Sequence, residues 1–422
     1  MKADASASTW RDLRIAKTVA AGAAVALLGA LFLAAPAMAW TTPVGVSPLG
    51  PVADLVGAEE GPTGDAIVGW ELNGMTPSVI QGRVRAADGT LGATNTITSN
   101  AAQAPSAFAM EGSKAYFLWV GSDGVNDRVQ MRTLSTAGTL GPVVTVSPPN
   151  KDAAQPAFDV DAGGDAVVAW TVGDRVIQAR NVSAAGTLGP LEVVSPIDER
   201  SRQPKVAVDS TGDAVILWNR STDGSLHAVQ RQSDGTLGPV IDLAARGYPY
   251  YLVSDAAGDS VIAYKVNRDV DKYVLQTRTL SADGTLGPEQ LAGAIATPSP
   301  AALAIDPTGP ALLSWESRSG AIVLRTLTTS GGLGPANTLS SAGTSPDIGL
   351  DSSGNSVIGW NERPDNHQQT WARRRAAGGS LGPAQLVSGV RPGGAPLVGL
   401  NDNGDAIAAW ENRGRVLISA DP

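Results

Sequence analysis

Residues 156–195 read PAFDVDAGGDAVVAWTVGDRVIQARNVSAAGTLGPLEVVS, and most of the chain repeats this pattern. The Gly-Thr-Leu-Gly-Pro segment, or a close variant, recurs seven times at intervals of 47 to 49 residues, beginning at Gly89, Gly138, Gly186, Gly235, Gly284, Gly331 and Gly379. An apolar run closed by an aromatic residue occurs eight times, at Trp70, Trp119, Trp170, Trp218, Tyr264, Trp315, Trp360 and Trp410. A period in this range indicates a repeat architecture.

Each repeat predicts four short strands, named a to d, which in the quoted stretch are residues 157–161, 166–171, 175–182 and 191–195. Valine-rich runs of this length between turn residues are typical of strands and too short for most helices. The Asp161-x-x-Gly164 segment predicts a tight a–b turn, and Ser-Ala-Ala-Gly at 183–186 predicts a c–d turn. These turns define one rim, the turn rim. The b–c and d–a loops define the opposite, variable rim.

The fold expected from this pattern is all-β: an eight-bladed β-propeller of four-stranded antiparallel blades. The eighth repeat ends after strand c at Pro422, whereas residues 42–48, TPVGVSP, match the strand d at 142–148, PVVTVSP. We therefore expect an N-terminal strand to complete the C-terminal blade and close the ring, which leaves no open end to fray. An open solenoid would instead require a polar capping repeat at each end.

The first 39 residues predict a secretory signal peptide. Arg11, Arg14 and Lys17 precede an apolar run at 19–35, and Ala-Met-Ala at 37–39 is a small-x-small cleavage site. A retained anchor is the alternative, since the run is at the short limit of a membrane span. The expected organisation is a signal peptide at 1–39 and a single propeller domain at 40–422. We expect a secreted or extracytoplasmic monomer with no membrane insertion after cleavage.

Composition excludes several classes of function. Residues 40–422 contain 27 basic and 38 acidic residues, so the net charge is about −11, and no Lys/Arg run is present. Nucleic acid is therefore not an expected partner, because phosphate binding needs clustered positive charge. The absence of cysteine excludes thiolate metal sites and a cysteine nucleophile. The two histidines, His227 and His367, lie in different repeats, so we predict no catalytic residues, no metal and no cofactor. Calcium at the Asp-x-x-Gly turns remains an open alternative.

The repeats resemble the Asp/Gly/Trp repeats of exported bacterial, actinobacterial-type β-propeller proteins of unassigned function, over residues 41–422. That resemblance implies a fold and an export route but no activity. Sialidase Asp-boxes and quinone-dependent dehydrogenase repeats fit less well, because their Trp follows the Gly by three and four residues. Here Gly212 and Trp218 are six apart.

An arginine precedes the c–d turn glycine by six residues in six repeats, at Arg83, Arg132, Arg180, Arg278, Arg325 and Arg373. The fourth repeat has Val229 at this position. Two interpretations fit this pattern: a ring that binds anions, or long side chains that span each blade and bond to neighbouring carbonyls. Repetition of the residue in six of the eight repeats favours the structural one.

The variable rim carries the candidate binding residues, because loops that differ between repeats are where a site is added to a scaffold. The b–c loops contribute Arg220, Glu316, Arg318, Glu362, Arg363, Glu411 and Arg413. The d–a loop of the fifth repeat contributes Tyr248, Tyr250 and Tyr251, and its b–c loop, 265–272, is long and charged. Exposed tyrosine beside arginine is a common recognition surface. The alternatives are a solvated rim of mixed charge and tyrosines that simply pack.

These features favour an exported, non-catalytic scaffold that binds a polysaccharide or a cell-surface protein on its variable rim. One rival is a carbohydrate-active hydrolase or lyase, in which paired carboxylates at the channel mouth act as acid and base. A structural spacer with no specific ligand is the other.

Overall fold

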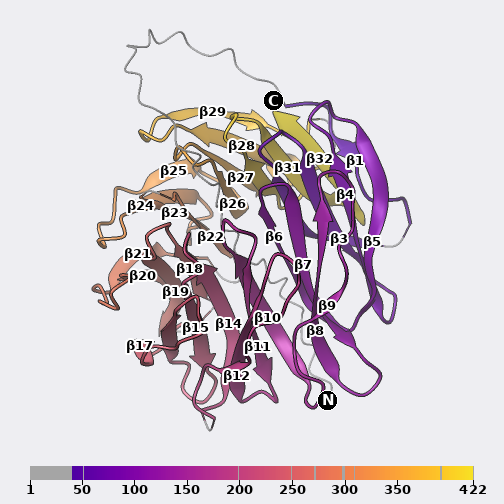
Figure 1. Ribbon diagram of the computed structural model, residues 1–422. Coiled ribbons are helices and arrows are strands. Elements are labelled where there is room, and N and C mark those ends of the chain that lie inside the picture. The colour runs from indigo at the N-terminus through magenta and orange to yellow at the C-terminus, as the bar shows by residue number, and fades with distance from the viewer. Residues whose placement is uncertain are drawn as a thin grey trace, which may run out of the picture.

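The computed structural model describes residues 40–421 except 51, 198, 249, 270–271, 297–299, 308 and 390–391. The predicted signal peptide lies outside the described residues. Eight antiparallel four-stranded sheets are formed within them, and they are arranged as the blades of a ring (Figure 1). No helix in this described part of the chain has the length and apolar character needed to cross a membrane.

The strands follow the repeats in order, from the innermost strand a to the outermost strand d. Blades 1 to 4 comprise β2 (Ala53–Glu60), β3 (Ala66–Leu72), β4 (Ser78–Arg85) and β5 (Leu91–Ala101); β6 (Gln103–Glu111), β7 (Lys114–Ser122), β8 (Asp127–Ser135) and β9 (Val144–Thr145); β10 (Ala153–Val160), β11 (Ala166–Val172), β12 (Val176–Val182) and β13 (Glu192–Val193); and β14 (Ser201–Val208), β15 (Ala214–Arg220), β16 (Leu226–Arg231) and β17 (Ile241–Ala244).

Blades 5 to 8 continue the pattern, and a 3-10 helix (Pro364–Asn366) interrupts the b–c loop of blade 7. Their strands are β18 (Tyr250–Ser254), β19 (Ser260–Asp269), β20 (Lys272–Leu280) and β21 (Gln290–Ala294); β22 (Ala301–Ile305), β23 (Ala311–Glu316), β24 (Ile322–Leu327) and β25 (Asn337–Ser340); β26 (Thr344–Leu350), β27 (Ser356–Glu362), β28 (Gln369–Arg375) and β29 (Leu381–Leu386); and β30 (Leu397–Leu400), β31 (Ala406–Asn412), β32 (Arg415–Asp421) and β1 (Val44–Gly45).

The predicted ring closure is confirmed. Strand β1 pairs antiparallel with β32, placing Val44 opposite Ile418, so the indigo and yellow ends of the chain share one blade (Figure 1). The Thr41 amide donates to the Ala420 carbonyl at 2.8 Å, and the Val416 amide donates to Ser47 Oγ at 2.9 Å. The N-terminal segment thus takes the place of the strand d that the last repeat lacks.

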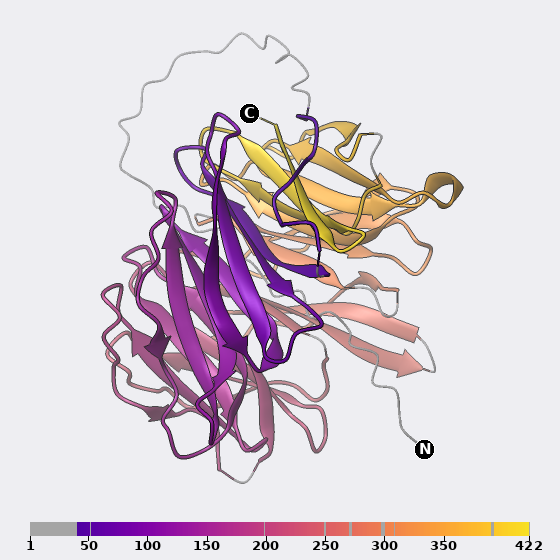
Figure 2. The same cartoon turned by 90° about the vertical axis from the view of Figure 1, so that its right-hand side faces the viewer.

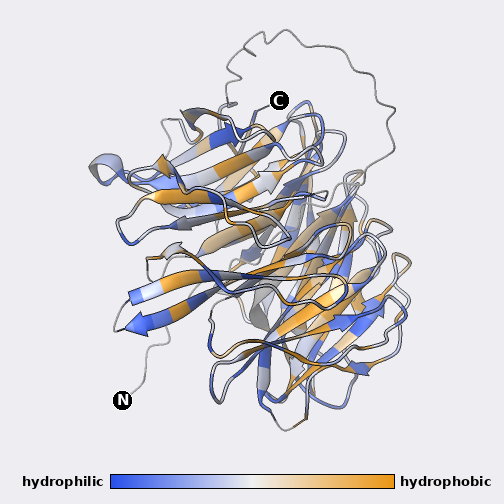
Figure 3. Ribbon diagram, turned by 90° about the vertical axis from the view of Figure 1, so that its left-hand side faces the viewer, coloured by the Kyte–Doolittle hydropathy of each residue, from blue (hydrophilic) through white to orange (hydrophobic). Residues whose placement is uncertain are grey.

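The core is divided among the blade boundaries. The aromatic residue that closes each strand b packs against the preceding blade: Trp218 lies with Ile177 of blade 3, and Trp70 lies with Ile407 and Ile418 of blade 8. Eight clusters of buried apolar residues fill the boundaries, including the one across the chain ends. Strand b is apolar on both faces because each face meets a neighbouring blade, and the hydrophobic colour in Figure 3 follows the strands.

Five of the six repeated arginines join neighbouring blades, as the structural interpretation predicted, and Arg373 Nε donates to the Gly382 carbonyl of its own blade at 2.5 Å. Nη1 of Arg83, Arg132, Arg180 and Arg325 donates to a strand d carbonyl of the preceding blade, at Val46, Ile97, Val146 and Ala292, over 2.9 to 3.2 Å. Arg278 makes the same contact with Leu243. Blade 4 has Val229 there and uses a buried pair instead, in which Arg231 Nε and Nη2 each donate to Glu192 of blade 3 at 2.6 Å. These guanidinium groups are therefore occupied by the framework.

The prediction of a long, charged b–c loop at 265–272 is wrong. Strands β19 and β20 extend the hairpin outward, with Val266 opposite Val274 and Asp269 opposite Lys272. Alternation of Tyr264, Val266 and Val274 with polar residues supports continued pairing. The hairpin projects beyond its neighbours (Figure 2), and the outer ends of its two strands are hydrophilic (Figure 3).

Candidate functional site

Tyr248 presents an aromatic ring on the variable rim, in the d–a loop between β17 and β18. Its side chain is 39% exposed. The backbone amide donates to the Lys265 carbonyl at 2.9 Å, and the phenolic oxygen accepts a hydrogen bond from Gln203 Nε2 at 3.1 Å. Burial of part of the ring raises the pKa of Tyr248, against the effect of the Gln203 bond. The result is a neutral ring that is held in place while one side meets solvent.

Two glutamines, one in blade 3 and one in blade 4, connect Tyr248 to these neighbouring blades through hydrogen bonds. Gln155 and Gln203 occupy bulges at the start of strand a, with φ of 50° and 55°. Gln155 Oε1 accepts from the Gln203 amide at 3.1 Å and from Thr171 Oγ1 at 3.2 Å. The side chain of Gln203 then reaches Tyr248. Backbone strain of this kind is retained where surrounding bonds over-determine it, commonly at binding sites.

Sequence reasoning missed both glutamines. A signal was present, because a Gln-Pro pair opens strand a at 155–156 and again at 203–204. Proline restricts the backbone of the residue before it, so each pair marks an irregular start of strand a. The side-chain connection from blade 3 to blade 5 depends on the spacing of the blades, which the repeat pattern does not reveal.

Tyr250 and Tyr251 do not form part of an exposed surface, which corrects the expectation for this loop. They are 3% and 5% exposed and belong to the cores of two different blade boundaries. The Tyr250 hydroxyl donates to the Gln203 carbonyl, and the Tyr251 oxygen accepts from the Ala301 amide at 2.8 Å. Burial raises the pKa of Tyr251 to about 12. Both residues begin β18, so alternation along an inner strand turns each toward a neighbouring blade.

Lys265, whose carbonyl accepts from the Tyr248 amide, is 4% exposed. Burial lowers the pKa of its ammonium group to about 8, and the nearby charge of Glu316 opposes that shift. Lys265 occupies the position directly after the aromatic residue of strand b, where Glu316 stands in blade 6. The two side chains therefore place opposite charges near each other in adjacent blades.

The other carboxylates predicted for this rim are engaged by the framework. Glu362 Oε1 accepts from Trp360 Nε1 at 2.7 Å and from Ser340 Oγ at 2.6 Å. Glu411 Oε1 accepts from the Leu55 amide at 2.6 Å, across the boundary between blades 8 and 1. Glu316 and Glu362 end β23 and β27, and Glu411 is the last residue but one of β31. Two of these three carboxylates therefore bind donors within the ring, and acid–base pairing finds no support in their contacts.

The arginines of the b–c loops are dispersed around the rim. Arg318 Nη2 donates to the Tyr273 carbonyl at 3.3 Å, and Arg363 and Arg413 are exposed. Arg220 turns outward along blade 4, where Nη2 lies 2.9 Å from His227 Nε2 and Nε donates to Ser225 Oγ at 3.2 Å. The predicted residues thus do not form one hydrogen-bonded group, and of the three predicted tyrosine positions Tyr248 is the exposed one.

A Ser–His–Asp array in blade 4 was not expected from the sequence. Ser225 Oγ lies 2.7 Å from His227 Nε2, and His227 Nδ1 lies 2.8 Å from Asp242 Oδ1. Ser225 is 8% exposed, and its hydroxyl also bonds to Asp223 Oδ1 at 2.6 Å. A nucleophilic serine needs access to a substrate and a hydroxyl proton directed at the histidine. Here Ser225 is buried and shares its hydroxyl with Asp223, whereas the Asp242 side chain is 89% exposed.

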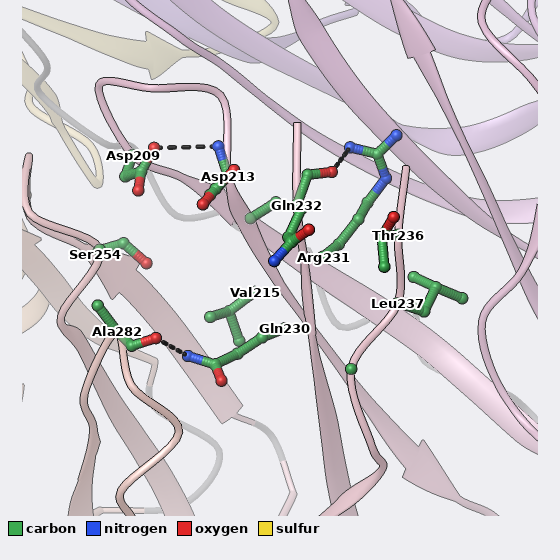
Figure 4. Close-up of a pocket in the computed structure, with 13 residues that line it drawn as sticks. Asp209, Asp213, Val215, Gln230, Arg231, Gln232, Thr236, Leu237, Ser254 and Ala282 are labelled. Atoms are coloured by element: carbon green, nitrogen blue, oxygen red, sulfur yellow. Dashed lines mark hydrogen bonds between the residues drawn. The ribbon is translucent and has the colours of Figure 1, made fainter. Parts of the chain in front are cut away.

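A hollow of about 210 Å³ lies on the turn rim between blades 4 and 5 (Figure 4). It exists because Ser254 ends strand a where Val160, Val208 and Ile305 stand in other blades. Its polar groups serve the turns: Asp209 Oδ1 accepts from the Asp213 amide at 3.0 Å, and Gln230 Nε2 donates to the Ala282 carbonyl at 3.0 Å. Among the residues described, no three His, Asp or Glu side chains gather closely enough to hold a metal ion.

The ring of eight sealed blades defines the chain as an eight-bladed β-propeller. No protein-family model and no curated protein sequence matches it. Similar solved structures include the BP39L lectin from Burkholderia pseudomallei, with a TM-score of 0.56, 10% identity, and coverage of 80% of this chain and 99% of that one. The polysaccharide lyase Uly1 is similar with a TM-score of 0.46, 8% identity, and coverage of 76% and 92%. The likeness to the lectin is one of fold.

Proposed function

We propose that the protein is an exported, non-catalytic scaffold that binds polysaccharide on its variable rim, around Tyr248. The observation that carries the proposal is the partly exposed Tyr248 ring, whose hydroxyl bonds to Gln203 and whose backbone amide bonds to the Lys265 carbonyl. An aromatic face accepts the C–H face of a sugar ring, and fixing that face in advance lowers the entropic cost of binding.

The polar groups around the ring suit hydroxyl ligands. Gln203 offers amide groups, and Glu316 offers a carboxylate in the next blade. A polysaccharide presents many weak contacts of this type along one chain, so modest affinity per sugar is sufficient. The description of the similar BP39L propeller as a lectin agrees with this class of ligand.

The test is binding of purified 40–422 to immobilised polysaccharides, with wild type compared against Tyr248→Ala. We expect the substitution to weaken binding about tenfold or more, which corresponds to about 1.4 kcal/mol. Tyr248→Phe keeps the ring and loses only the Gln203 bond, so it should retain most of the affinity. Val125→Ala, at an exposed position on the same rim in blade 2, is the matched control and should bind as wild type.

The same preparation distinguishes the rivals. Cleavage of a bound polysaccharide, abolished by Glu316→Gln, would replace the proposal with a hydrolase or lyase. Blank results with every polysaccharide would favour a protein ligand or a spacer. Binding that is unchanged in Tyr248→Ala would place the ligand elsewhere on the ring.

A further inference from the structure

A Trp–Gln pair is repeated in the first three blades, with one internal difference. Trp70, Trp119 and Trp170 lie directly opposite Gln81, Gln130 and Gln178 in the pairing of strands b and c. In blades 1 and 2 the indole Nε1 donates to the glutamine Oε1 at 3.2 and 3.0 Å. In blade 3 both atoms are shielded from solvent, and neither has a hydrogen-bond partner.

A cavity opens at this place in blade 3. It measures about 130 Å³ and lies on the variable rim between blades 2 and 3. Trp170, Gln178, Val172 and Leu191 line it from blade 3, and Asn150 and Lys151 line it from the preceding d–a loop. A single water needs only about 10–15 Å³ by the same measure. The space therefore suits a group with the bulk of a sugar ring.

The unpaired atoms specify what such a group must offer. A buried N–H and a buried amide oxygen without partners are each destabilising, so an occupant that satisfies both is favoured. One hydroxyl does this, because its oxygen accepts from Trp170 Nε1 while its proton is donated to Gln178 Oε1. Lys151 and Asn150 offer donors for a second oxygen, and Val172 and Leu191 offer apolar walls for C–H groups.

Trp218 in blade 4 provides a contrast within the same ring. Its Nε1 also lacks a partner, but the His227 ring stacks beside the indole with centroids 6.0 Å apart. Trp218 is not among the residues that line the blade 3 cavity or the turn-rim hollow. An unpaired indole alone does not make a site. In blade 3 it coincides with an unpaired acceptor and with open space.

We propose that this cavity, the blade 3 pocket, binds one neutral sugar residue through a hydroxyl shared between Trp170 and Gln178. The pocket lies at a different blade boundary from Tyr248, so the inference goes beyond the proposed function and does not depend on it. The ammonium group of Lys151 disfavours cationic ligands. A ligand of this size that makes few polar contacts is expected to bind with a dissociation constant on the order of 1 mM.

The experiment records indole N–H resonances of the ¹⁵N-labelled protein during titration with methyl glycosides of glucose, mannose, galactose and N-acetylglucosamine. Trp170→Phe assigns the Trp170 signal. We expect one of these probes to shift that signal saturably and to leave Trp119 unmoved, since the blade 2 pair is already closed. Glycerol is the control for a small hydroxyl compound that does not fill the space. A Trp170 signal unmoved by every glycoside would overturn the proposal and leave a cavity that holds only water.

Two variants complete the test. Gln178→Leu removes the acceptor and should weaken the glycoside by tenfold or more, whereas Gln130→Leu in blade 2 should not change it. Lys151→Ala, at an exposed position that cannot affect folding of the core, should weaken binding severalfold. Wild-type affinity in both Gln178→Leu and Lys151→Ala would contradict the assignment.

Tyr248→Ala separates this proposal from the proposed function. The substitution should leave the Trp170 response to the glycoside unchanged even where it abolishes polysaccharide binding. If no polysaccharide binds while the glycoside still shifts the Trp170 signal, the rim site is disproved and the blade 3 pocket is supported. Loss of the Trp170 shift in Tyr248→Ala would overturn the pocket as an independent site.

Discussion

Replacing Ser47 by alanine removes one side-chain hydrogen bond from the boundary that closes the ring. Ser47 Oγ accepts from the Val416 amide at 2.9 Å, across 369 positions of the sequence, and both residues are buried. Alanine leaves this amide without its side-chain acceptor in an environment from which water is excluded. The cost of a buried unsatisfied group is about 1–3 kcal/mol, which is about a 5- to 150-fold change in an opening equilibrium.

Blade 3 provides a matched control for this substitution. Ser195 Oγ accepts from the Ile177 amide, also at 2.9 Å, but both residues belong to one continuous repeat. Urea unfolding followed by tryptophan fluorescence gives the change in free energy, and hydrogen exchange reports the Val416 amide directly. We expect Ser47→Ala and Ser195→Ala to cost similar amounts, and we expect Val416 exchange to accelerate only in Ser47→Ala.

One combination of results would contradict closure of the ring by the N-terminal strand. If Ser195→Ala costs about 1–3 kcal/mol while Ser47→Ala changes neither the unfolding free energy nor Val416 exchange, the N-terminal strand is not docked. If the N-terminal strand closes the ring, Ser47 and Ser195 should contribute similar amounts to the free energy of unfolding.

Three further predictions concern the framework. Arg231→Met should lower the free energy of unfolding in urea by about 3–5 kcal/mol, because it leaves Glu192 buried and unpaired. Adding Glu192→Leu should recover most of that loss. A loss below about 1 kcal/mol in Arg231→Met alone would contradict the prediction. Burial, and then Asp405, raises the pKa of Glu60 from 4.5 to about 8, so the folded state holds a proton that the unfolded state has released. The free energy of unfolding should therefore fall as pH rises from about 4.5 to about 8, and a Glu60→Gln variant that kept this slope would assign it to another group. Gly212→Val should cost about 1–3 kcal/mol, because Gly212 has a φ of 85°, and an unchanged melting temperature would argue against that backbone conformation.

The fold was predictable because the repeats constrain it from several directions at once. The spacing of the aromatic residues gave the number of blades, and the turn chemistry gave the rims. The match between 42–48 and 142–148 gave the closing strand, which forms as expected. Strand limits were less accurate. In blade 3, β10 begins at Ala153, four residues before the predicted start, because a bulge at Gln155 lets the pairing continue past Pro156.

The candidate site was predictable only in part. Loop identity located Tyr248, but the burial of Tyr250 and Tyr251 depends on which face of β18 meets which neighbouring blade. The use of Glu362 to hold Trp360 depends on a side-chain rotamer. The blade 3 pocket depends on a Trp–Gln pair that is closed in two blades and open in the third, a difference that identical residue types at equivalent positions cannot reveal.

The most direct measurement is a hydrogen-exchange footprint of 40–422 with and without a polysaccharide that it binds. A binding site around Tyr248 predicts that the polysaccharide slows exchange at the amides of Gln203, Gly247 and Tyr248. These amides bond to Gln155, Gly224 and Lys265 on the variable rim. The turn amides of Asp213 and Gly258 should exchange at unchanged rates. Protection confined to those turns, with none around Tyr248, would contradict a binding site on the variable rim.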